Sequence, residues 1–166
     1  MAAQSIGEPG TQLTMRVRHA GGIVGLDVTQ GLPRVEELFE CRMPRNLSPV
    51  SEIAGSVTVK ETESGYEVTV RDESIKPAEE REYVIPLTSE LKVKDGDLVV
   101  AGDQLGSGYL DIKEVLQVRG LTGAQRYLIT EVQRVYESQG IAIHDKHFEV
   151  IARKMSDKVR IDTSGD

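Results

Sequence analysis

Four side chains of mixed chemistry recur at helical spacing near the start of the chain: Gln12, Met15, Arg16 and His19. The spacing i, i+3, i+4, i+7 places them on one face of a helix. Burial without partners would be costly for arginine or glutamine, and a solvated face has no need of methionine. The mixture suits an organic anion with a flat ring, because methionine can pack on a base while arginine and histidine reach phosphate oxygens. By spacing alone, a partly exposed helix face accounts for the same pattern.

A second group of chemically capable residues lies near the other end of the chain: His144, Asp145 and His147. Histidine and aspartate can ligate a metal, which would suit a metal hydrolase. No third strong ligand follows nearby, and Asp145 suits the N-cap of a helix. We therefore predict a helix cap beside exposed imidazoles and no metal site. The single cysteine, Cys41, excludes an internal disulfide and a four-cysteine zinc site.

The elements that must position the first group lie within residues 1–46, which we predict to form a helical hairpin. One helix is expected over about 11–20, with Pro9 near its start, where proline is tolerated. A second is expected over about 31–42, with proline in its first turn. Its apolar stripe consists of Leu32, Val35, Leu38 and Phe39.

Glycines join the two expected helices: Gly21, Gly22 and Gly25. Glycine stops a helix because it loses the most conformational freedom on folding. The joint is either a plain loop or a hinge at which the hairpin folds and unfolds, as elements that gate active sites require. We predict that 18–28 is the most mobile internal stretch.

Short runs within residues 47–110 alternate apolar and polar side chains and are separated by turn residues, which predicts a small antiparallel β module. Val57 and Val59 make one such run, Val68 and Val70 another, and 83–85 a third. The string KVKDGDLVVAGDQL at 92–105 resembles the hairpin turn of barrel-sandwich domains that carry lipoyl or biotinyl groups. Those carriers need a lysine in a Met-Lys-Met or Asp-Lys-Ala string, which the chain lacks, so we expect the architecture without the carrier function.

Residues 111–166 return to helix. One helix is expected to open at Thr122 or Gly123 and to end by Gly140, and a last one to follow Asp145. The core face of the first consists of Tyr127, Leu128, Val132, Val135 and Tyr136, and that of the last of Phe148, Ile151, Ala152 and Met155. The predicted fold class is therefore α+β.

Composition bounds the function. The 166 residues carry a net charge of −7, with 39% hydrophobic and 28% charged residues. The negative charge argues against gripping nucleic acid by bulk positive charge, and the acid-dense stretch 61–82 is expected to be a solvated surface. No apolar run approaches the roughly 20 residues of a membrane span, and no leader is visible. We expect a cytoplasmic protein without membrane contact.

Long strings carry a family resemblance. AAQSIGEPGTQLTMR at 2–16, followed by His19, a Gly-Gly pair and TQGLPRVEELFE at 29–40, closely resembles the trigger loop of the bacterial RNA polymerase β′ subunit. The similarity continues in order through SEIAG at 51–55, VKDGDLVVAGDQL at 93–105 and the string at 127–155, and so covers nearly the whole chain. The family usually has Thr-Phe where this chain has Val17-Arg18.

The resemblance implies a DNA-templated RNA-synthesising enzyme whose trigger loop closes on the incoming nucleoside triphosphate and assists nucleotidyl transfer. Met15 would pack on the base and Gln12 would lie near the sugar, while Arg16 and His19 would approach the triphosphate. His19 would act as a proton donor to the leaving pyrophosphate or as an electrostatic and positional aid, and both roles stay open. Arg18 would disfavour a protonated His19 if the two were close.

The remaining implications concern the rest of the enzyme. Residues 47–110 resemble the β′ jaw near downstream DNA, and 111–155 the helices after it. The family's metal-binding NADFDGD string is absent, so we expect no cofactor in this chain, magnesium bound by another segment, and an inactive isolated chain. Expected partners are the β, α, ω and σ subunits, the nucleotide, and template and downstream DNA. We expect a fragment, an engineered piece or one part of a split gene; alone, it would be a non-catalytic interaction module.

Overall fold

The computed structural model describes residues 1–19, 31–63, 65–163 and 165, with the backbone alone described for 13–19. The chain forms two compact units. One consists of Met1–Glu40 and Leu121–Asp166, and the other is Cys41–Gly120. The division of the chain into three domains, 1–46, 47–110 and 111–166, stays a prediction. The hinge glycines, Gly21, Gly22 and Gly25, and most of the stretch 18–28 lie outside the described residues.

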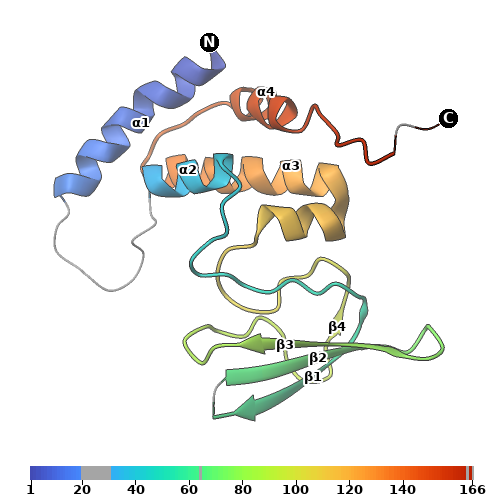
Figure 1. Cartoon of the computed structure of the whole chain (residues 1–166). Helices are drawn as coiled ribbons and strands as arrows, with labels where there is room; N and C mark the ends of the chain where they lie inside the picture. The colour runs from blue at the N-terminus through green and yellow to red at the C-terminus, as the bar shows by residue number, and fades with distance from the viewer. Residues whose placement is uncertain (20–30, 64, 164, 166) are drawn as a thin grey trace. The chain divides into compact units, whose positions relative to one another are not determined.

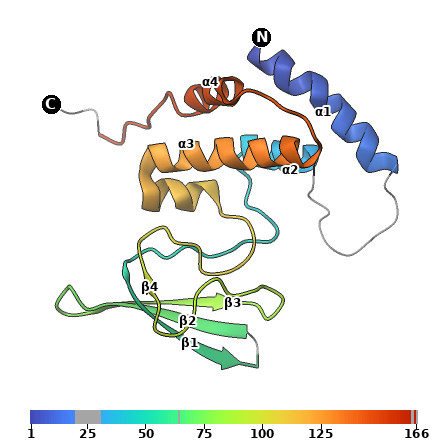
Figure 2. The ribbon, with the colours of Figure 1, turned by 180° about the vertical axis from the view of Figure 1, so that it is seen from behind.

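The first unit is helical. It contains α1 (Ala2–His19), α2 (Leu32–Phe39), most of α3 (Ile112–Ser138) and α4 (Asp145–Met155). Helix α2 lies beside α3 in both views (Figures 1 and 2), and an ion pair joins the two helices. No helix of the described ranges is both long enough and apolar enough to cross a membrane.

Helix α1 starts earlier than its sequence predicts. Pro9 lies inside it and not at its start. An interior proline normally costs about 3 kcal/mol or more, because it removes one helical hydrogen bond and crowds the preceding turn. Here Ile6, Pro9 and Gly10 are all buried on one side of the helix. Tertiary packing of that side overrides the local preference of proline.

The ends of the other helices also differ from expectation. Helix α2 is shorter than the predicted 31–42, since Cys41 has φ 50 and so leaves helical geometry. Helix α3 begins at Ile112 and is interrupted at Gly120, which has φ 70 and ψ −178. The early start follows from Asp111, whose carboxylate accepts from the Lys113 backbone N–H at 3.0 Å. The prediction of a helix that opens at Thr122 or Gly123 agrees with the segment of α3 that follows Gly120, and the segment from Ile112 to this break precedes it.

The second unit is built on a curled four-stranded antiparallel sheet, a half-barrel, within the described residues. Its strands are β1 (Gly55–Thr62), β2 (Gly65–Asp72), β3 (Glu79–Ile85) and β4 (Leu98–Val99), in the order β3-β2-β1-β4. Val57 pairs with Val70 and Val59 with Val68, which confirms the alternation seen in the sequence. The core of this unit consists of Val57, Val68, Val70, Ile85, Val93, Val99 and Leu105. The α+β class is confirmed.

Candidate functional site

Helix α1 carries all four candidate side chains of the N-terminal group, since Gln12, Met15, Arg16 and His19 lie within Ala2–His19. At 100° per residue, the centre of the face that these four positions share lies about 120° from the centre of the buried face formed by Ile6, Pro9 and Gly10. The shared face is therefore centred away from the side by which α1 packs on its own unit, and Arg16 borders that side, about 20° around the axis from Pro9.

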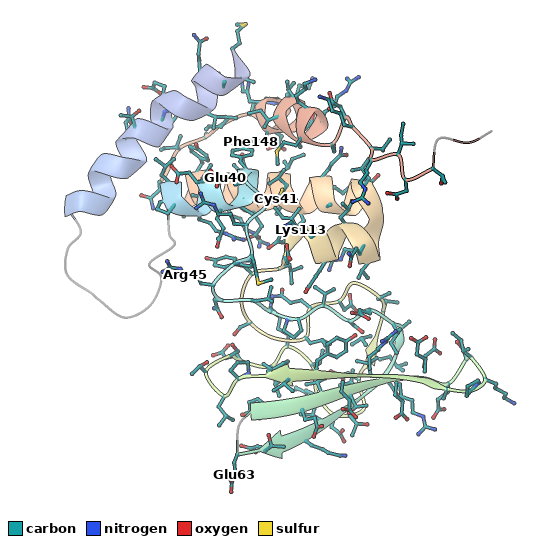
Figure 3. All side chains as sticks on the ribbon, in the orientation of Figure 1. Glu40, Cys41, Arg45, Glu63, Lys113 and Phe148 are labelled. Carbon is teal, nitrogen blue, oxygen red and sulfur yellow. The ribbon has the colours of Figure 1, made fainter. Side chains whose placement is uncertain are left out.

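The packed side of α1 is attached near its N-terminal end. The hydroxyl of Tyr136 on α3 donates to the backbone oxygen of Ile6 at 2.9 Å, and this bond is buried. The Tyr136 ring also packs on Phe148 with centroids 5.8 Å apart, and Phe148 lies between α4 and α3 (Figure 3). With a rise of 1.5 Å per residue, Gln12 lies about 9 Å and His19 about 20 Å beyond Ile6 along the helix. The candidate face thus lies past the attachment point.

Of the four side chains, the structure describes that of Gln12. It is exposed, and its amide donates to Glu8 Oε1 at 3.4 Å, one helical turn back. This bond uses one of the two amide hydrogens, so the second hydrogen and the amide oxygen can still meet a sugar hydroxyl. The side chains of Met15, Arg16 and His19 lie outside the described part, so their contacts stay predictions.

A groove of about 550 Å³ runs between α1, α2 and the end of α3. Its walls are almost wholly apolar. They consist of Ile6, Gly7, Gly10, Thr11, Leu32, Val35, Glu36, Phe39, Glu40 and Tyr136. Such a lining suits hydrocarbon or an aromatic ring better than a phosphate, since its two hydroxyls, of Thr11 and Tyr136, already donate to backbone oxygens. The groove is therefore a packing surface, distinct from the polar face of α1.

A buried ionic cluster joins α2 to α3. The guanidinium of Arg34, a residue only 2% exposed, lies 2.5 Å from Glu37 Oε2 and 3.6 Å from Glu131 Oε2. Its Nη2 atom also lies 3.5 Å from the Tyr127 hydroxyl. Sequence reasoning missed this cluster. A signal was present, since Arg34 sits in the first turn of α2, where the helix dipole disfavours a cation.

His144 is the N-cap of α4, in place of the predicted Asp145. Its Nδ1 atom accepts from the Lys146 backbone N–H at 3.2 Å. Asp145 instead occupies the first turn, where its negative charge favours the helix N-terminus. Within the described residues, no group of three histidine, cysteine, aspartate or glutamate side chains is placed to hold a metal ion.

The sheet unit has an acidic cavity of its own, of about 610 Å³, with Glu52, Glu82, Tyr83 and Glu114 among its walls. Burial raises the pKa of the Glu114 carboxyl, and the nearby carboxylates of Asp111 and Glu52 raise it further. These charges repel phosphate. The cavity therefore does not suit the anion that the face of α1 suggests.

Cys41 lies in the same unit and is not an activated thiol. Burial raises its pKa; Lys113 opposes this and Asp111 adds to it. The thiolate, which is the reactive form, is therefore disfavoured. Figure 3 shows Cys41 just after α2 and Lys113 on the first turn of α3.

Comparison with known proteins covers the whole chain. The model of the family described as RNA polymerase Rpb1, domain 5, matches residues 1–83 and 45–166. The chain is 52% identical over 166 residues to the DNA-directed RNA polymerase subunit beta′ of Alkaliphilus oremlandii and to that of Acetivibrio thermocellus. It is 50% identical to that of Clostridium botulinum strain Loch Maree. Each match covers 100% of this chain and 14% of the relative's length.

Proposed function

This chain belongs to the RNA polymerase Rpb1 domain 5 family, and we propose that it serves DNA-templated RNA synthesis as part of a bacterial β′ subunit. In this proposal α1 and α2 are the two helices of a trigger loop, which closes on the incoming nucleoside triphosphate and assists nucleotidyl transfer. The activity belongs to the complete enzyme, since the chain spans 14% of the length of the relatives that it matches.

One observation carries the proposal. Helix α1 is continuous from Ala2 to His19, and it carries four chemically suited positions on one face, whose centre lies about 120° from the centre of its packed side. A surface that must meet a ligand held elsewhere has to be free of its own unit. The described attachments of α1, the Tyr136 bond to Ile6 and the buried Pro9 and Gly10, come before the candidate positions in the chain, which supports a role for that face toward a partner segment.

The proposed chemistry is positioning and charge stabilisation. Met15 packs on the base, Gln12 lies at the sugar, and Arg16 and His19 face the triphosphate. Phosphoryl transfer depends mainly on alignment and on neutralising charge that develops on phosphate oxygens, so a guanidinium and an imidazolium suffice for this half of the site. His19 either donates a proton to the leaving pyrophosphate or stabilises the charge of the pyrophosphate electrostatically.

The metal chemistry belongs to another segment of the enzyme. Within the part of the chain that the structure describes, no group of three histidine, cysteine, aspartate or glutamate side chains could hold a metal ion. We propose an isolated chain without polymerase activity. In the complete cytoplasmic enzyme its partners are the β, α, ω and σ subunits, the nucleotide, and template and downstream DNA.

We assign the sheet unit to the jaw near downstream DNA. The walls of its cavity carry three glutamates. Some basic side chains of the unit already pair with carboxylates, as Arg81 does with Glu52 at 3.6 Å. An acidic surface favours contact with protein or solvent over a grip on DNA. The curled sheet, with its own core, also supports a second candidate function, a non-catalytic scaffold module of barrel-sandwich type.

The test is single-nucleotide addition by a complete polymerase that carries this segment. Replacing His19 or Arg16 by alanine should slow addition by about ten-fold or more, because each removes a charge-assisted contact to the triphosphate. Promoter binding should stay nearly unchanged. Arg18→Ala is the matched control: it removes the same charge two positions along, about 200° around the helix axis from Arg16.

Unchanged addition rates in both the His19 and Arg16 variants would refute the trigger-loop assignment and favour the scaffold function. An equal loss in the Arg18 variant would show that α1 needs charge in general, and that the candidate face has no special role.

A further inference from the structure

The buried cluster around Arg34 is the feature of the helical unit that the proposed function does not use. Arg34 is 2% exposed, and its partners Glu37 and Glu131 are 8% and 7% exposed. Each of these charges lost its hydration on folding, which costs several kcal/mol per ion unless good geometry compensates. A cluster of this kind is a weak source of stability but a strong source of specificity, because a misplaced partner leaves a charge buried and uncompensated.

The location of Arg34 indicates a tertiary role. It lies in the first turn of α2, where a cation opposes the helix dipole, so its ion pair with Glu37 on the same helix does not by itself explain its place there. The N-cap position of α2 is Gly31, which has φ 81 and no side chain with which to cap the helix. The start of α2 therefore depends on Pro33 for its backbone and on Arg34 for its polar attachment to α3.

The guanidinium bridges two helices as a fork. Its Nη1 atom meets Glu37 on α2 itself, while Nη2 meets Glu131 and the Tyr127 hydroxyl on α3. Glu131 lies five positions before Tyr136, about 7.5 Å along α3, and Tyr136 holds α1 through the Ile6 carbonyl. One short stretch of α3 thus carries an attachment point for both α1 and α2.

We propose that Arg34 is a positioning residue. Its fork to Glu131 sets the place of α2 on α3, and through α2 it sets where the candidate face of α1 meets the nucleotide. This inference rests on the proposed trigger-loop function. It differs from a purely structural role, because a misplaced α2 lowers the population of the nucleotide-competent arrangement in molecules that are still folded and assembled.

The experiment is rapid-quench single-nucleotide addition, in a complete polymerase, over a range of nucleotide concentrations. Arg34→Lys keeps the charge but cannot span both helices, and Glu131→Gln removes the second charge at constant shape. Each should raise the half-saturating nucleotide concentration about ten-fold, because the apparent affinity falls with the fraction of competent molecules. The amplitude of extended product should stay that of the unmodified enzyme, since the assembled fraction is unchanged.

Arg134→Ala is the matched control. Arg134 lies 2.7 Å from the same Glu131, but its side chain is 70% exposed, so its loss should leave the half-saturating concentration within two-fold. An Arg34→Lys enzyme that behaves like this control would overturn the inference, and so would a lower amplitude with unchanged half-saturation. If Arg34→Lys prevents assembly, Glu131→Gln decides by the same two readouts.

The two proposals fail in different ways. A slow His19→Ala enzyme beside normal Arg34 and Glu131 variants would remove the positioning role and leave the trigger-loop function intact. Normal addition by both the His19 and Arg16 variants would remove the function itself.

Discussion

Replacing Gly10 by alanine is expected to stabilise α1, although Gly10 is buried. A methyl group at this position would meet Leu32 Cδ1 at 3.6 Å and the Tyr136 hydroxyl oxygen at 3.7 Å. Both are ordinary van der Waals distances, so nothing needs to shift. The methyl would enter the apolar groove between α1 and α2 and fill part of it.

Two contributions set the magnitude. Alanine is favoured over glycine by about 1 kcal/mol inside a helix. Burying one methyl group adds about 0.8 kcal/mol. The sum is about 1–2 kcal/mol, which corresponds to a rise of several degrees in the melting temperature of a domain of this size.

Gly7→Ala provides the control within the same helix. Gly7 is exposed, and a methyl group there would meet nothing within 4 Å. The Gly7→Ala variant should therefore gain only the stability that comes from the helix preference of alanine. The difference in stability between the two variants then gives the contribution of packing the methyl group in the groove. Native-state hydrogen exchange of the α1 amides is the assay, because it reports the opening of this helix whichever unit of the chain melts first.

A Gly10→Ala chain no more protected than Gly7→Ala would refute the reasoning about the groove. A Gly10→Ala chain less stable than the unmodified one would mean that α1 approaches α2 and Tyr136 more closely than the structure has it.

Two further predictions concern titrating groups. Tyr136→Phe should cost about 1 kcal/mol in urea unfolding, since it removes the bond to Ile6 and keeps the ring contact. Burial raises the pKa of Tyr136, so this contribution is complete below the usual value of 10.0 and is lost as pH rises through the higher folded-state pKa. Likewise, the pKa of Glu114 is raised by burial and by the nearby carboxylates of Asp111 and Glu52. The folded state therefore keeps its full stability below 4.5, where Glu114 is neutral, and loses part of it as pH rises through the folded-state pKa. Glu114→Gln should melt higher than the unmodified chain at neutral pH, and the two melting curves should converge below pH 4.5; a constant gap would contradict the assignment.

Much of the architecture is legible in the sequence, because it depends on neighbours along the chain. The alternation of Val57 with Val59 and of Val68 with Val70 predicts two half-buried strands, and these pair with each other. The helical spacing of Leu128, Val132 and Tyr136 predicts the buried face of α3, and all three are buried. Both periodicities follow from backbone geometry alone.

Helix boundaries were less predictable, because they depend on contacts that are remote in sequence or on caps that are easily overlooked. Pro9 looks like a helix start, yet it lies within α1, where its buried side is held against the unit. Asp111 caps a first segment of α3, ahead of the break at Gly120 after which the predicted helix begins. At the other end of the chain, His144 caps α4 by a ring nitrogen, a role more often taken by the neighbouring aspartate.

The sequence by itself determined the family, the α+β class and the shared helix face of Gln12, Met15, Arg16 and His19, because strings and periodicities are local properties. Only the tertiary structure decided what holds that face in place. Tyr136 reaches Ile6 across 130 positions and Arg34 reaches Tyr127 across 93. Whether a charge or a hydroxyl is buried depends on which distant segment covers it, and no spacing along the chain encodes that directly.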